Sequence, residues 1–210
     1  MTIIQAKIAD VDDLQARRNS AAENLLRQDL SAIESIEATI EIIDVGIGKE
    51  PEYLTVGKTP LERVHKLLSK LDSIRVSKDR GSLVSKEGDD LFHKYVEQIE
   101  SIFKNLPKPL KWRSFLMHDL ILLTDIPSKV QKASVKHKLN KAQTKALARL
   151  ERASDKVFND VTQKGSIPFK GQNSDLLPKL KLNEFSGREI QAFAEDLEKT
   201  NKKEEQKQVD

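Results

Sequence analysis

The sequence predicts an all-α fold, built as an elongated helical bundle with coiled-coil-like long helices and a short C-terminal helix after an extended linker. Three observations support this class. Apolar residues recur at steps of three and four over most of the chain, as on one face of a helix. Aromatic residues make up only 5% of the chain, which argues against a large β-sandwich or barrel. Charged residues reach 33%, which is typical of helical assemblies with thin cores.

Isoleucine and leucine residues form a helical seam near the N-terminus. They follow three- and four-residue steps at Leu26, Leu30, Ile33, Ile36, Ile40, Ile43 and Ile47. Because these steps depart from a strict heptad, packing within a bundle fits the pattern as well as a free coiled coil does. We expect this first long helix to stop near Gly46 and Gly48, since glycine commonly ends helices.

A triplet further along, Gly57-Lys58-Thr59, matches the end of a nucleotide-binding P-loop. A P-loop needs a second glycine five residues earlier, so that backbone amides can wrap the phosphate, but that position is Glu52. An enzyme built on Lys58, Thr59 and Asp125 would also need a parallel sheet, and the chain shows no alternation of strands and helices. The enzyme interpretation is therefore the weakest of those considered.

The triplet is better explained as the start of a helix. Thr59 and Glu62 fit a capping box, and Pro60 stands at the first helical position, where its missing N–H costs nothing. Apolar residues then follow at helical spacing, at Leu61, Val64, Leu67, Leu68, Leu71 and Ile74. We therefore expect a helix to begin at Pro60.

The middle of the chain predicts two more helical segments after a polar loop at residues 77–90. The first, residues 91–106, should end at Pro107, because proline cannot continue the helical hydrogen-bond ladder. The second, residues 112–123, is the most apolar part of the chain, and we expect it to be buried centrally as a helix, with a strand as the alternative.

From residue 127 to 164 no glycine or proline intervenes, and the spacing predicts one long helix that completes a bundle over residues 1–164. Residues 165–185 should form an extended linker. The Ser-x-x-Glu pattern at residue 186 predicts a capping box that opens a helix over 186–200. Residues 201–210 have too few apolar side chains to stay packed and should form a disordered tail.

Charge is distributed unevenly along the chain. Residues 1–50 carry ten acidic against five basic side chains, whereas residues 101–150 carry eleven basic against two acidic. On one helix, six cations would lie within about 80° of one another and extend for roughly 27 Å, at Lys138, Lys141, Lys145, Arg149, Arg152 and Lys156. Such a stripe suits an acidic protein or a nucleic acid, or is simply solvated. An anionic membrane surface is less favoured, because no exposed aromatic wedge stands beside it.

The linker contains a second candidate partner surface. Five apolar residues are unusual in a free linker and indicate either packing back onto the bundle or an interface with another subunit: Leu176, Leu177, Leu180, Leu182 and Phe185.

No catalytic or cofactor-binding pattern emerges from the sequence. Cysteine is absent, which excludes disulfides and thiolate metal sites. The four histidines are isolated from one another and from metal-ligand spacings, at His65, His93, His118 and His137. We therefore expect no enzymatic activity, no metal and no cofactor.

The favoured function is a helical interaction or scaffold subunit of a larger intracellular assembly, with homo- or hetero-oligomeric protein partners. The alternative is a nucleic-acid-binding module that uses the basic helix at residues 127–164. The first residues lack the basic and apolar runs of a secretory signal, and no run of about eighteen apolar residues predicts a membrane span. We therefore expect a cytoplasmic or nuclear location.

Overall fold

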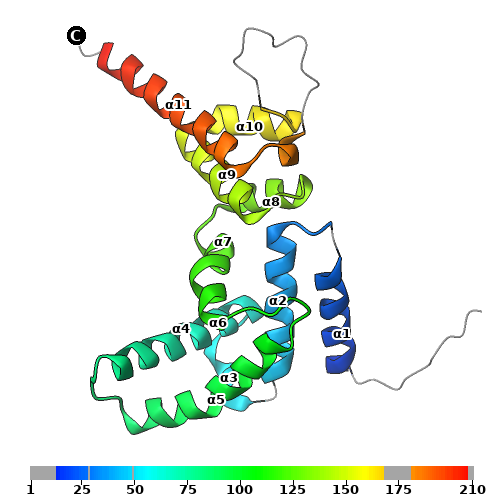
Figure 1. Ribbon diagram of the computed structural model, residues 1–210, viewed down its shortest axis with the longest axis vertical. Coiled ribbons are helices and arrows are strands. Elements are labelled where there is room, and N and C mark those ends of the chain that lie inside the picture. Colours follow the sequence, from blue (N-terminus) through cyan, green and yellow to red (C-terminus); the bar gives the residue numbers. More distant parts are fainter. Residues whose placement is uncertain (1–12, 28, 49, 168–180, 208–210) are drawn as a thin grey trace, which may run out of the picture. The chain divides into compact units, whose positions relative to one another are not determined.

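The computed structural model describes residues 13–27, 29–48, 50–167 and 181–207 (Figure 1). Within these ranges the chain forms helices and turns without a β-strand, so the predicted all-α fold is confirmed. The predicted coiled-coil-like elongation remains a prediction. The chain divides into two compact units, which are described separately: Met1–Arg27 with Glu37–Arg113 form the first, and Gln28–Ile36 with Ser114–Asp210 form the second. This division falls inside the range expected to form one bundle.

The first unit contains α1 (Asp13–Leu26), most of α2 (Ala32–Ile47), α3 (Pro51–Val56), α4 (Pro60–Asp79), α5 (Lys86–Lys104) and the start of α6 (Trp112–Ser114). Its core is formed by the apolar faces of α2, α4 and α5, on which Ile43, Leu68 and Ile99 are completely buried. As predicted, α2 ends at Ile47. α4 begins at Pro60 after Thr59, whose hydroxyl accepts a hydrogen bond from the Glu62 N–H at 3.2 Å.

The first predicted long helix is interrupted, which corrects the expected seam from Leu26 to Ile47. α1 ends at Leu26, and this side chain is 64% exposed. A new helix starts because Ser31 and Glu34 form a reciprocal cap. The Ser31 N–H donates to the Glu34 carboxylate at 2.8 Å, and the Glu34 N–H donates to the Ser31 hydroxyl at 3.3 Å.

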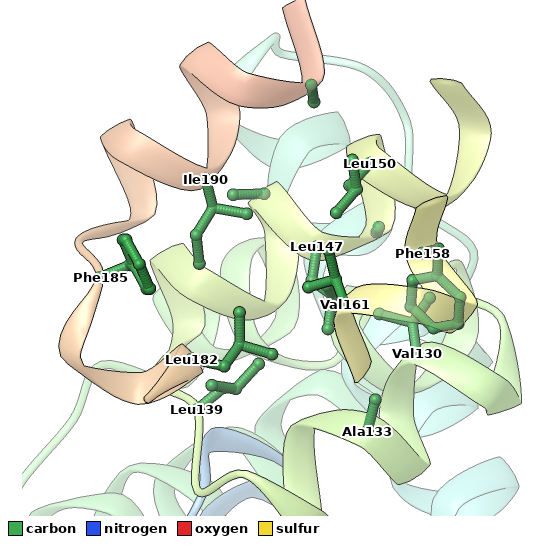
Figure 2. Packing of buried hydrophobic residues seen from close by; sticks show 13 residues of the cluster. Val130, Ala133, Leu139, Leu147, Leu150, Phe158, Val161, Leu182, Phe185 and Ile190 are labelled. Carbon is green, nitrogen blue, oxygen red and sulfur yellow. The ribbon is translucent and has the colours of Figure 1, made fainter. Parts of the chain in front are cut away.

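The second unit contains, after the first turn of α2, a π-helical turn η1 (Phe115–Asp119), α7 (Ile121–Thr124), α8 (Ser128–Lys136), α9 (Lys141–Ala153), α10 (Asp155–Lys164), the 3₁₀ turn η2 (Leu182–Glu184) and α11 (Gly187–Lys207). Figure 2 shows its core, in which side chains from α8, α9, α10, η2 and α11 converge. Leu147, Val161 and Ile190 are completely buried there.

The segment expected to be central and apolar is helical but not buried on all sides. Phe115, Leu120 and Leu122 are buried, whereas Met117 is 54% exposed. The strand alternative is therefore wrong, and the helix here includes the π-helical turn η1.

The predicted single helix over residues 127–164 is divided into three, which is a second correction. At the first break Lys138 adopts a left-handed conformation with φ of 54°, and Asn140 caps α9 through a capping box with Gln143. At the second break the Ser154 hydroxyl accepts from the Val157 N–H at 3.3 Å and starts α10. Polar caps therefore start a new helix at each break, where glycine and proline are absent.

The C-terminal helix starts at the predicted capping box, since the Glu189 N–H donates to the Ser186 hydroxyl at 3.2 Å. It continues to Lys207, beyond the expected end at residue 200, so residues 201–207 are helical rather than a disordered tail. One cause is an anchor, because the Asn201 side-chain amide donates to the Ala153 carbonyl at 3.0 Å. Lysine, glutamate and glutamine, which follow, also favour helix.

Candidate nucleic-acid interface

Helix α9 presents one buried and one solvent-facing side in the second unit. Its buried side contains Leu147 and Leu150, which belong to the core. Lys145 and Arg152 are exposed on its outer side. Seven residues separate them, so they differ by only about 20° around the helix and lie about 10 Å apart along it. Lys156, near the start of α10, is exposed as well.

Lys141, at the start of the same helix, has an internal role. Its ammonium forms an ion pair with Asp119, whose side chain is only 4% exposed. A buried carboxylate needs a cation or hydrogen-bond donors, since water no longer stabilises its charge. Lys141 is therefore the counter-ion that allows Asp119 to be buried beside α9.

Lys138 also has a partner inside the second unit. Its ammonium lies 2.9 Å from Oε1 of Glu34, in the first turn of α2. Burial alone would raise the pKa of Glu34, but the hydrogen bonds from Ser31 and Lys138 outweigh it and hold the pKa below its usual range. The Ala32 N–H donates to the Leu139 carbonyl at 2.8 Å, so this ion pair flanks a backbone attachment.

Arg149 is held by α11, which lies along α9 (Figure 1). Its guanidinium contacts the carboxylate of Glu195 at 2.7 Å and that of Glu198 at 3.0 Å. The hydrogen bond to Glu198 raises the pKa of Arg149 above its usual range and outweighs the opposing desolvation. Arg149 therefore joins two helices, and its charge is already matched by two acids.

The six predicted cations thus separate into two groups of three. Lys138, Lys141 and Arg149 form ion pairs with acids of the second unit. The other three are exposed, and within the described ranges they form no ion pair; we call them the basic surface: Lys145, Arg152 and Lys156. A continuous stripe on one helix is not what the structure contains, because Lys138 precedes α9 and Lys156 lies on α10.

The apolar candidates of the linker fall into two groups as well. Leu176, Leu177 and Leu180 lie outside the described residues. Leu182 is completely buried and Phe185 is 7% exposed, and both belong to the core of the second unit (Figure 2). For these two side chains the structure matches the first alternative, packing back onto the chain's own helices.

Sequence reasoning missed the residue that fastens this segment, Gln143. Its side chain is nearly buried, and its amide nitrogen donates to the carbonyls of Asn183 at 2.9 Å and Phe185 at 2.6 Å. Its side-chain oxygen accepts from the Asn140 N–H at 2.8 Å. The Asn-x-x-Gln capping box at residue 140 was the available signal in the sequence.

The histidines occupy structural or solvent-facing positions. His118 is exposed, and Nε2 of His137 lies 2.8 Å from the Thr162 carbonyl near the end of α10. Among the described residues, no three side chains of the types that bind metals are grouped closely enough to hold an ion. In the same ranges, none of the helices combines the length and apolar character that crossing a membrane requires.

The chain is 26% identical over 121 residues to the "Probable plasmid-partitioning protein ParB" of Thermus thermophilus. The matched stretch covers 58% of this chain and 35% of that protein, so the similarity extends over about a third of the relative's length. No family model and no solved structure matches the chain.

Proposed function

We propose that this chain is a non-enzymatic binding protein whose second unit contacts the phosphate backbone of duplex DNA. The observation that carries the proposal is the basic surface, because Lys145, Arg152 and Lys156 are exposed and lack an acidic partner in the described ranges. The similarity to a protein named for plasmid partitioning supports DNA as the partner, since a plasmid is DNA. A DNA partner implies an intracellular location, in the cytoplasm or the nucleus.

The chemistry of the basic surface favours backbone contacts over base recognition. Lysine and arginine neutralise phosphates and release condensed counter-ions, which makes binding depend steeply on salt. Proteins that bind single strands stack bases on exposed aromatic rings. In the described part of the second unit Phe115, Phe158 and Phe185 are buried. We therefore expect duplex binding with little sequence preference.

The test is the affinity for a fluorescently labelled duplex of mixed sequence, measured by anisotropy across a salt series. The test variant reverses the basic surface, with Lys145→Glu, Arg152→Glu and Lys156→Glu. If all three contact phosphates, the slope of log K against log salt should lose about 2.7, and affinity at low salt should fall about tenfold or more. Lys141 and Arg149 are left intact, because they hold acids of the second unit.

A matched control variant separates local contacts from net charge. Lys58→Glu, Lys70→Glu and Lys86→Glu change the net charge equally but lie in the first unit, where all three side chains are exposed. The proposal requires this control to bind nearly as tightly as the unmodified chain. Equal losses in the two variants would show that overall charge, and not the basic surface, determines binding.

A scaffold function with protein partners is the second candidate. Apolar side chains on the first unit favour it, since Leu83 is fully exposed and Leu54 is 50% exposed. Large exposed apolar side chains often belong to protein interfaces. Light scattering of the purified chain at rising concentration tests self-association, and Leu54→Ser with Leu83→Ser should abolish it. A strictly monomeric chain that captures no partner would remove this candidate.

A further inference from the structure

The segment that joins α5 to α6 in the first unit is basic and contains no acidic residue. We call residues 104–111, the last residue of α5 and the loop that follows it, the basic loop. It carries Lys104, Lys108 and Lys111, and Arg113 follows after Trp112. Arg113 differs from the three lysines, because its Nε donates to Asp72 of α4 at 2.8 Å.

The loop is held at both ends by buried side chains. Leu106 is 5% exposed and Trp112 is 6% exposed, so both side chains are buried. The Leu110 N–H donates to the Phe103 carbonyl at 3.4 Å, which draws the loop back to the end of α5. Two prolines within it restrict φ further. A loop constrained in this way loses little conformational entropy when it binds a partner.

The three lysines are available to a partner. Lys104, Lys108 and Lys111 are all exposed, and across the described ranges they make no ion pair. Some cations of the neighbouring α4–α5 hairpin differ in this respect. Lys78 is paired with Asp89, and Arg75 is paired with Asp79. Lys70, Arg80 and Lys86 of the same hairpin are exposed and, in the described ranges, make no ion pair either. The basic loop differs from them because it gathers three such lysines within eight residues that include no acid.

We infer that the basic loop is a second phosphate-contacting surface for DNA, additional to the basic surface of the second unit. The inference rests on the proposed function and extends it to the first unit. A lipid surface would share the attraction to cations, but membrane-bound loops also insert exposed aromatic or large apolar side chains. Trp112 is buried, and Leu110, at 39% exposed, is the one large apolar side chain that the loop exposes, so the loop lacks an aromatic wedge. DNA is therefore the better-matched anionic partner.

Two phosphate-contacting surfaces on one chain should act together. When one surface is bound, the other is held near the same duplex at high effective concentration, which raises the overall affinity without new contacts. Loss of the loop should therefore weaken binding even though the basic surface remains. If each lysine contacts one phosphate, the salt slope should fall by about 2.7 when the loop is reversed.

The experiment compares four variants of the whole chain with the unmodified chain on the same labelled duplex across a salt series. The loop variant carries Lys104→Glu, Lys108→Glu and Lys111→Glu. The second carries the reversed basic surface, the third combines both, and the fourth is the Lys58, Lys70 and Lys86 reversal as the control. All reversed side chains are exposed, so circular dichroism and thermal unfolding should match the unmodified chain.

We expect the loop variant to lose about tenfold or more in affinity and part of its salt slope, while the control changes little. The combined variant should bind more weakly than either single-surface variant. If the loop variant binds as tightly as the control while the basic-surface variant binds more weakly, the inference is overturned and the proposed function stands. The opposite pattern would support the loop as a DNA site and overturn the role of the basic surface.

Vesicles with and without phosphatidylserine supply the other arm of the test. We expect no binding to either kind. Binding to phosphatidylserine vesicles that the loop variant loses, with unchanged DNA affinity, would overturn the inference in favour of a lipid partner. An unmodified chain that binds no DNA at low salt would overturn both proposals together.

Discussion

Replacing Asp44 with alanine should destabilise the first unit strongly, because this carboxylate joins α2 to α3 and α4. The side chain is only 6% exposed, and its partner Arg63 is 14% exposed. Arg63 donates from Nε to Oδ1 at 2.8 Å and from Nη2 to Oδ2 at 2.7 Å. The Tyr53 hydroxyl donates to Oδ1 at 2.9 Å. Burial, and then the charge of Asp44, raise the pKa of Tyr53, so the phenol stays protonated and remains a donor.

The expected loss follows from what the substitution leaves behind. Asp44→Ala removes the acceptor of three hydrogen bonds and leaves the mostly buried Arg63 guanidinium without its carboxylate. Breaking a buried ion pair from one side typically costs about 3–5 kcal/mol, because the remaining charge stays desolvated. Glu41→Ala on the same helix is the matched control. Its pair with Arg17 is far more exposed, so the control should cost less than about 1 kcal/mol.

The assay is urea unfolding followed by tryptophan fluorescence. Trp112 is the single tryptophan of the chain and is buried in the first unit, so its emission reports on that unit. We expect a clearly lower unfolding midpoint for Asp44→Ala than for Glu41→Ala. Equal midpoints for the two variants would refute the view that this network stabilises the first unit.

Three further predictions concern both units. Tyr53→Phe should cost about 1–2 kcal/mol, because it removes a buried hydrogen bond. Tyr95→Phe should be neutral or stabilising in the same urea assay, because the buried Tyr95 hydroxyl has no hydrogen-bond partner among the described residues. Gly187→Ala should weaken the docking of α11, because a Cβ there would lie 2.8 Å from the backbone of Ala142. Amide hydrogen exchange in α11 should become faster in this variant, and unchanged protection would count against this packing. Folding lowers the pKa of Glu34 from 4.5, so its contribution to the stability of the folded state is present above about pH 4.5 and is lost as acid protonates the carboxylate. Glu34→Gln should therefore flatten the decline of Tm below that pH. An unchanged decline would contradict this assignment.

Much of the fold could be predicted from the sequence, because helical spacing survives in the pattern of apolar residues. The helix starts at Thr59 and Ser186 could be predicted because each has a hydroxyl cap, a glutamate three residues later and a clear break before it. The reciprocal capping box forms at Ser186, whereas the Glu62 carboxylate accepts from the Lys58 N–H instead of the Thr59 N–H. The breaks at Ser31, Asn140 and Ser154 were missed. Their caps lie within continuous apolar spacing and without glycine or proline, so the apolar pattern alone does not show a break there.

The sequence could predict which cations belong to the candidate site, but not which of them are free of ion pairs within the chain. The sequence shows six cations in one region, but it does not show which of them have partners. Glu34 lies 104 residues from Lys138, and Glu195 lies 46 residues from Arg149. Ion pairs across such separations depend on tertiary packing, so local spacing could not divide the cations into internal and exposed groups. The role of Lys141 was hidden in the same way, because its partner Asp119 belongs to a different helical turn.

The most direct test of the account is the affinity of the unmodified chain for labelled duplex DNA across a salt series, beside the Lys145, Arg152 and Lys156 reversal. We predict binding that weakens steeply with salt, and a reversed variant with a markedly lower affinity and a shallower salt slope. Two results would contradict the assignment of the basic surface as a DNA interface. One is an unmodified chain that does not bind DNA at low salt. The other is a folded reversed variant that binds DNA as tightly as the unmodified chain.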